Sequence, residues 1–224
     1  MHRLISAAKI RYTEKGNDFV TFVPTFSAAM EVMLPPTGDV DVLHWLDEET
    51  RVHRARLERH ARIAALLAPA VTPGAYLDVL ARALGFCAPL ELALSRVPRF
   101  GLHPTRAPLI ARDLLALGLP EPALGGLPLC PSVPSLATAG RALGGRFVLE
   151  SYPVGGAVAL RHLARTLGVT PARGGAFFTA ADALPRWRHL GHDVRAFVVR
   201  GGALDEIVSG ATEAYEALHA WMDA

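Results

Sequence analysis

The chain has 224 residues, of which 51% are hydrophobic and 20% are charged, and its formal net charge is +2. This composition excludes a mainly disordered chain, which would be poorer in large apolar residues and more strongly charged. The charge is too small to support nucleic-acid binding, and the two cysteines lack the CxxC spacing of metal and redox motifs. No apolar run reaches the ~18–20 residues of a membrane span. We therefore expect a cytoplasmic, single-domain protein without nucleic-acid or membrane partners.

Residues 1–40 differ from the rest of the chain in their pattern of apolar and polar residues. Apolar and polar residues alternate between Asp18 and Phe26, which predicts one or two short strands. The segment Leu34-Pro-Pro-Thr-Gly38 then marks a break. We expect a short irregular or β-like N-terminal extension of unknown role over 1–40, followed by a helical domain over 41–224.

From Asp41 onward, apolar residues recur three and four positions apart, a spacing typical of helices. The first long helix is expected from Leu43 to Leu67. Thr72 and Pro73 are typical of a helix start, and they predict a second helix that ends near Arg96. Further helices are expected over 107–117, 135–167, 183–199 and 204–222, with a proline-rich irregular crossing over 119–135.

The helix expected over 135–167 contains Pro153, Gly155 and Gly156 within four positions. Proline removes one backbone hydrogen bond, and each glycine costs about 1 kcal/mol relative to alanine, so we expect a kink there. The glycines also allow a flat ligand to approach the helix backbone closely. Close packing of another helix against them is the alternative.

The stretch Phe147-Val-Leu-Glu-Ser-Tyr-Pro-Val-Gly-Gly156 resembles the distal-helix motif of bacterial heme oxygenases, of the biliverdin-producing type associated with bacteriophytochromes. Other segments resemble that family in the same order: Gly85-Phe-Cys-Ala-Pro-Leu-Glu91, Asp113-Leu-Leu-Ala-Leu-Gly-Leu-Pro120, Leu127-Pro-Leu-Cys-Pro131, and Gly174-Gly-Ala-Phe-Phe178 with Trp187 after it. The resemblance covers about residues 41–222. It implies an all-α, single-domain, heme-oxygenase-like helical bundle.

The resemblance also implies an activity, a cofactor and partners. Such an enzyme opens heme to biliverdin, CO and ferrous iron, using O₂ and electrons from a separate reductase or ferredoxin, and a bacteriophytochrome is a further implied partner. Heme, the cofactor and substrate, would lie between a proximal helix that carries a histidine ligand and the kinked distal helix. Ser151, Gly155 and Gly156 would form the distal wall, and Phe147 and Tyr152 would contact heme. The family pattern usually has glycine where this chain has Ser151.

The proximal motif of the family has a histidine four residues after a threonine and three before Leu-Glu. When Thr50 and Leu57-Glu58 are aligned with that motif, Arg54 stands at the ligand position. His53, one residue earlier, and His60 are therefore the two candidate iron ligands. The third alternative is that no histidine of the protein binds the iron.

Heme propionates are carboxylates, and arginine binds carboxylates with two parallel hydrogen bonds. The candidate arginines are Arg51 and Arg54 near the proposed proximal histidine, with Arg186 and Arg188 on the helix expected over 183–199. Two other functions remain open. One is a catalytically weak heme-oxygenase-like protein that binds heme or a bilin, and the other is a helical interaction module without a tetrapyrrole.

Overall fold

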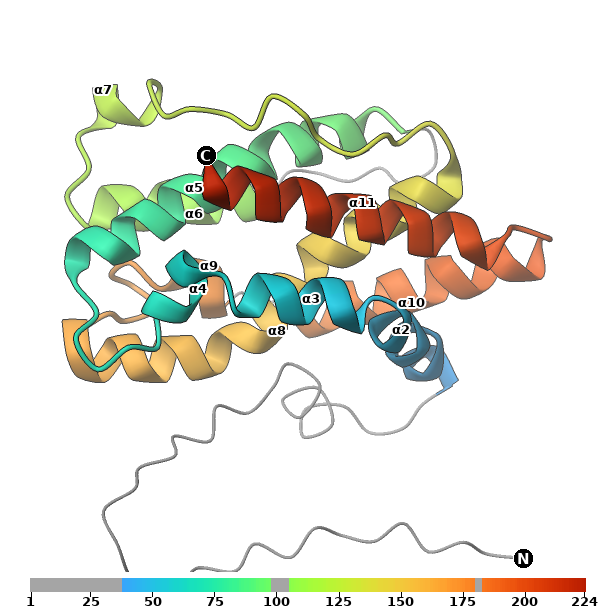
Figure 1. Cartoon of the computed structure of the whole chain (residues 1–224), viewed down its shortest axis with the longest axis horizontal. Coiled ribbons are helices and arrows are strands. Elements are labelled where there is room, and N and C mark those ends of the chain that lie inside the picture. The colour runs from blue at the N-terminus through green and yellow to red at the C-terminus, as the bar shows by residue number, and fades with distance from the viewer. Residues whose placement is uncertain (1–37, 98–104, 180–182) are drawn as a thin grey trace, which may run out of the picture.

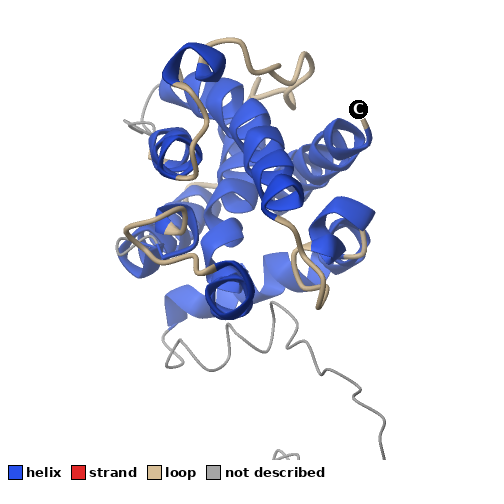
Figure 2. Cartoon of the chain, turned by 90° about the vertical axis from the view of Figure 1, so that its left-hand side faces the viewer, coloured by secondary structure: helices blue, strands red, loops and turns tan. Residues whose placement is uncertain are grey.

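The structure is a computed structural model that describes residues 38–97, 105–179 and 183–224, and these residues form helices joined by loops (Figure 2). The all-α prediction is thus confirmed for this part of the chain, whereas the β-like extension predicted over 1–40 lies almost wholly outside it. Helix α2 begins at Gly38, before the expected boundary at residue 41. In chain order the helices are α2 (Gly38–Glu49), α3 (Arg51–Glu58), α4 (Ala61–Ala65), α5 (Pro73–Ser95), α6 (Arg106–Ala116), α7 (Glu121–Leu124), α8 (Ala139–Leu167), α9 (Ala176–Thr179), α10 (Ala183–Val199) and α11 (Leu204–Asp223).

The single helix predicted from Leu43 to Leu67 is wrong, because the chain breaks it into α2, α3 and α4. At the first break, the buried Thr50 hydroxyl donates to the carbonyl oxygen of Leu46 at 2.8 Å. At the second break, His60 has an extended backbone, and its ring Nδ1 accepts the backbone N–H of Arg62 at 3.2 Å. Both side chains thus bond to backbone groups at helix ends, a role that competes with a continuous helix.

The boundaries predicted for α5, α6, α10 and α11 are confirmed to within one residue. Helix α5 begins as its sequence predicts, since the Thr72 hydroxyl accepts the backbone N–H of Ala75 at 3.1 Å and Pro73 occupies the first turn. The proline-rich crossing contains the short helix α7, which the irregular segment predicted over 119–135 did not include.

Helix α8 is the central element, and it packs against α11, α10, α9 and α5. It begins at Ala139, four residues later than expected, and ends at Leu167, where Gly168 with a positive φ of 67° forms the C-terminal cap. The helix runs through Pro153 without interruption, and Figure 1 shows it changing direction between its yellow first half and its orange second half, as the predicted kink requires. None of the helices in the described ranges combines the length and apolarity needed to cross a bilayer.

Glycines allow α8 and α11 to cross in backbone contact (Figure 1). A Cβ on Gly144 of α8 would lie 2.2 Å from the carbonyl oxygen of Ile207, and a Cβ on Gly210 of α11 would lie 2.3 Å from that of Arg141. Real Cβ atoms do not approach backbone atoms so closely, so a side chain at either position would force the helices apart. The position of α11 relative to α8 therefore depends on these two glycines.

We predict that Gly144→Ala lowers the free energy of unfolding by about 1–3 kcal/mol or more, because the new methyl group overpacks the crossing. Urea unfolding measures the change. Gly125→Ala is the matched control, since Gly125 has an ordinary φ of −69° and a Cβ there would lie 4.0 Å from the carbonyl oxygen of Pro122. Equal unfolding midpoints for the two variants would contradict the close crossing.

Candidate functional site

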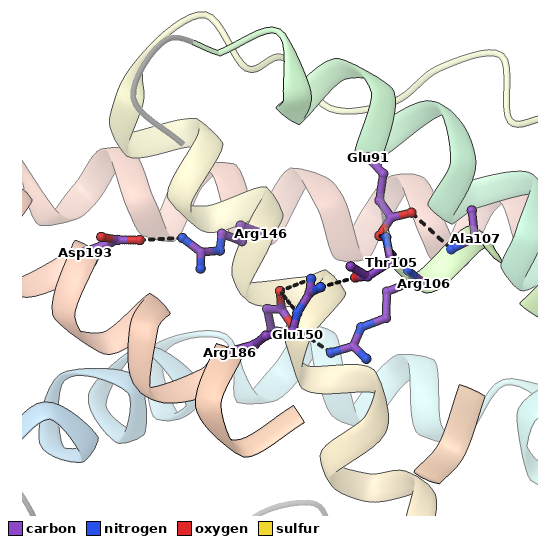
Figure 3. A network of polar contacts seen from close by, with 8 residues as sticks. All are labelled: Glu91, Thr105, Arg106, Ala107, Arg146, Glu150, Arg186 and Asp193. Carbon is purple, nitrogen blue, oxygen red and sulfur yellow. Dashed lines mark hydrogen bonds and ion pairs between the residues drawn. The ribbon is translucent and has the colours of Figure 1, made fainter. Parts of the chain in front are cut away.

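Several residues that carry the family resemblance have structural roles, beginning with Glu91 of α5. Its carboxylate accepts the backbone N–H groups of Thr105, Arg106 and Ala107 at 2.9, 2.7 and 3.0 Å (Figure 3). These groups are the unpaired donors at the start of α6, where a negative charge is also favoured by the helix dipole. Glu91 thus fixes the start of α6 against α5.

Asp113 has the same role at the start of α9. Its two carboxylate oxygens accept the backbone N–H groups of Ala176 and Phe177, both at 2.8 Å. Burial raises the pKa of Asp113, although the two backbone hydrogen bonds act in the opposite direction. Gly85 permits another close contact, because a Cβ there would lie 2.6 Å from the carbonyl oxygen of Pro128. These motif residues therefore hold the helices together.

Glu150 of α8 lies in the interior between two arginines (Figure 3). Arg106 Nη2 donates to Glu150 Oε2 at 2.6 Å, and Arg186 Nη2 donates to Glu150 Oε1 at 2.5 Å. Burial raises the pKa of Glu150, but the hydrogen bonds and positive charges of the two arginines outweigh burial and hold this pKa below its ordinary value. Arg186 also donates to the hydroxyl of Thr105. Arg186, which was expected to bind a heme propionate, thus already binds Glu150 and Thr105.

Ser151 follows Glu150 and is buried. Its hydroxyl donates to the carbonyl oxygen of Val148 at 2.8 Å, and its Oγ lies 3.4 Å from the hydroxyl of Tyr215 in α11. Burial raises the pKa of Tyr215, which is therefore a neutral phenol near pH 7.

The other residues of α8 expected to line or contact the heme are Gly156, Phe147, Tyr152 and Gly155. A Cβ on Gly156 would lie 2.6 Å from Phe178 Cδ1 of α9, so the structure shows the packing alternative at this glycine. Phe147 is fully buried in the core beside Trp187, with their ring centroids 5.5 Å apart. The surroundings of Tyr152 and of Gly155 lie outside what the structure describes.

Arg54, at the position of the family's proximal histidine, is buried between two carboxylates. Its Nε lies 2.9 Å from Asp47 Oδ1, and its Nη1 donates to Glu58 Oε1 at 2.9 Å. Burial lowers the pKa of Arg54, but the charges of Asp47 and Glu58 outweigh it and raise this pKa. Arg54 thus ties α2 to α3, which leaves the propionate role predicted for it without direct support.

The two candidate iron ligands have different surroundings. His53 is half-buried on α3, and its Nδ1 lies 3.6 Å from Glu216 Oε1 of α11. His60 is buried, and both of its nitrogens have partners: Nδ1 accepts the backbone N–H of Arg62, and Nε2 lies 2.9 Å from Asp223 Oδ1. Because Nδ1 of His60 accepts a hydrogen bond, the ring proton lies on Nε2 and is donated to Asp223. Iron binding by His60 would require both contacts to break.

The last two candidate arginines are exposed. Arg51 of α3 lies 3.3 Å from Glu48 through Nε, and Arg188 lies on the exposed side of α10. Exposed arginines at the mouth of a site are able to bind a carboxylate without losing a buried partner.

Two contacts join α8 to neighbouring parts of the chain, one to α11 and one to the loop after α4. One is the Ser151–Tyr215 contact described above, in which Tyr215 belongs to α11, the helix packed on α3. The other is 2.9 Å long, from Nε2 of His162 near the end of α8 to the carbonyl oxygen of Ala68 after α4. Ser151 and His162 are eleven residues apart, three helical turns, so they share one face of α8. This face of α8, together with α3 and α4, is the candidate site, here called the α3–α8 site.

Helical spacing also indicates which distal glycine belongs to this face. Gly155 and Ala159 follow Ser151 at intervals of four and lie on the same face, whereas Gly156 is rotated by about 100° toward α9. Sequence reasoning missed Tyr215 and His162. Tyr215 is a core position of α11, and its hydroxyl was the sequence signal that it could form a polar contact. His162 could have been found from helical spacing, because it lies on the same face of α8 as Ser151 and Gly155.

Comparisons of this chain with protein-family models, with curated proteins and with solved structures found no match. Within the described part of the chain, no group of three histidine, cysteine, aspartate or glutamate side chains is arranged to hold a metal ion. The residues of the α3–α8 site and the resemblance of the sequence to heme oxygenases are therefore the grounds for a function.

We predict that Glu150→Gln lowers the free energy of unfolding by about 3–5 kcal/mol at pH 7, because it leaves the buried Arg106 and the partly buried Arg186 without their carboxylate. Glu213→Gln is the matched control. Glu213 pairs with Arg141 on the surface, where both side chains are about one-third exposed, so its loss should cost less than about 1 kcal/mol.

The effect of Glu150→Gln should depend on pH. The pKa of Glu150 is lowered in the folded protein. Its contribution to the free energy of unfolding is therefore complete above the pKa of an unfolded glutamate, and it is lost as the pH falls through the folded-state pKa. The stability difference between wild type and Glu150→Gln should therefore shrink in acid. Urea unfolding from pH 7 to pH 3 measures it, and a difference that stays constant with pH would contradict the ion pair.

Proposed function

We propose that the chain is a heme oxygenase that binds heme in the α3–α8 site and opens it to biliverdin, CO and ferrous iron. The observation that carries the proposal is that the face of α8 with Ser151, Gly155 and His162 contacts α11, the helix packed on α3, at one end and the carbonyl oxygen of Ala68, after α4, at the other. In the proposed site, this helix face with small residues would form one wall and the helix that bears His53 the other. A flat ligand between two helices needs such a pair of walls.

His53 is the histidine of the two whose surroundings suit an iron ligand. The Glu216 carboxylate beside Nδ1 favours the proton on that nitrogen, so Nε2 becomes the nitrogen with a lone pair for a metal. Metal-bound histidines commonly have such a carboxylate on the second nitrogen. We therefore assign the ligand role to His53 and a structural role to His60.

The other residues of the site would bind and orient heme. Arg51 and Arg188 are the candidates for the propionates, because Arg54 and Arg186 already bind Asp47 and Glu150. The buried Ser151 would form the wall of the site on the α8 side. Heme itself supplies the oxygen chemistry when it is bound, and the electrons would come from an external reductase or ferredoxin. Supply of biliverdin to a bacteriophytochrome is the corresponding proposal for a partner.

A second candidate function is binding of heme or a bilin without opening of the ring. The observation that favours it is the buried Arg54, which occupies the family's ligand position with its carboxylates Asp47 and Glu58. A site with this arginine and without histidine ligation would still hold an acidic tetrapyrrole, but would bind iron weakly.

A heme titration followed in the Soret region separates these functions. We predict a saturable Soret shift that decays into a bilin band after a reductant and air are added. His53→Ala should weaken heme binding about tenfold or more, because the iron loses its protein ligand. His60→Ala should lower stability and leave the Soret band in place.

His189→Ala, at an exposed position on α10, is the control for loss of a surface histidine. Heme binding without decay would support the second candidate function. No saturable binding by the wild-type protein would contradict both. A Soret shift abolished by His60→Ala but not by His53→Ala would reverse the assignment of the ligand.

A further inference from the structure

The short helix α4 depends on polar contacts at both of its ends. It has five residues, none of which is buried, and a helix of this length is marginal without outside support. Before its start, His60 Nε2 donates to Asp223 Oδ1 of α11 at 2.9 Å. After its end, His162 Nε2 of α8 donates to the carbonyl oxygen of Ala68 at 2.9 Å. Two histidines therefore hold the two ends of this segment.

The two histidines differ in what a second proton on the ring would do. His162 uses an N–H group as a donor, and this group is present in both the neutral and the charged ring. His60 is also an acceptor, because its Nδ1 caps α4 by accepting the backbone N–H of Arg62 at 3.2 Å. A charged imidazole has an N–H on both nitrogens and accepts nothing. Proton uptake at Nδ1 of His60 is thus incompatible with the cap, whereas the bond to Asp223 is kept.

Charged and titratable side chains from four helices face His60 or the capped residue: Arg56 of α3, Arg62 of α4, Asp78 of α5, and His219 and Asp223 of α11. The hydrogen bond from His60 lowers the pKa of Asp223, so this carboxylate stays charged in mild acid. Burial, and then the charge of Arg56, lower the pKa of His219, which therefore gains its proton only at a lower pH than an ordinary histidine. Asp78 pairs with the guanidinium of Arg62 and not with its backbone.

We propose that α4 is an acid-sensitive element of the fold, in which proton uptake by His60 removes the cap at Nδ1 and unwinds α4 while Asp223 keeps His60 on α11. Histidine ordinarily changes charge between about pH 5 and pH 8, so mild acid is the trigger. The switch is a property of the protein alone. Because α4 belongs to the α3–α8 site, loosening of that site in acid is a consequence, and this consequence rests on the function proposed above.

Hydrogen–deuterium exchange of the protein without heme tests the proposal at about pH 7.5 and about pH 5.5. Each measured rate is divided by the intrinsic rate at the same pH. The protection of the amides of residues 62–66 should fall about fivefold at the lower pH, which corresponds to the loss of one N-cap. In His60→Asn the protection should be the same at both pH values, because the side-chain oxygen of asparagine caps a helix and does not titrate.

His219→Asn is the matched control. It removes the other histidine beside Asp223 and leaves the cap of α4 in place, so its protection should fall in acid as in the wild type. A second readout needs no variant. In NMR spectra of the wild type, the backbone amide of Arg62 should shift with pH at the same midpoint as the ring protons of His60. This readout decides the proposal if His60→Asn does not fold.

The outcomes that overturn the proposal are distinct. Unchanged protection of α4 in the wild type between the two pH values would overturn it. An equal loss of protection in the wild type and in His60→Asn would also overturn it, because acid would then act through another group. An Arg62 amide that does not follow the His60 ring has the same meaning. None of these measurements involves heme, so the switch and the proposed function stand or fail separately.

Discussion

The buried ion pairs of Glu150 are the interaction on which the arrangement of the central helices depends. One carboxylate on α8 binds Arg106 at the start of α6 and Arg186 on α10, and Glu91 of α5 holds the start of α6 from the other side (Figure 3). A charge at this depth is tolerated only because it is paired. Since Glu150 directly precedes Ser151, the same contacts set the rotation of α8 about its axis and thereby the face on which Ser151 lies.

Close helix contacts then place the second wall of the site. Gly144 and Gly210 allow α11 to lie directly on α8, and this distance brings the hydroxyl of Tyr215 to Ser151. Helix α3 in turn packs on α11, with His53 beside Glu216. The position of His53 relative to α8 therefore depends on contacts made through α11.

Apolar periodicity and helix caps predicted most helices, but they did not indicate which polar side chains form hydrogen bonds or ion pairs with one another. The start of α5 at Thr72-Pro73 could be predicted because its signal is local. The breaks at Thr50 and His60 could not, because apolar spacing continues through both and the cause is a side-chain bond to the backbone. Contacts between residues far apart in the sequence could not be predicted either. Arg186 was expected to bind a propionate and instead binds Glu150. The contact of Tyr215 with Ser151 depends on how α11 packs against α8.

The central claim is that heme lies between α3–α4 and the Ser151–His162 face of α8. Hydrogen–deuterium exchange of the protein with and without heme tests it most directly, because it reports two distant segments in one experiment. The account predicts that heme slows amide exchange in residues 50–65 and in residues 151–162 together, with smaller changes in α6. Protection of only one of these segments, or protection confined to another part of the protein, would contradict the placement of the site.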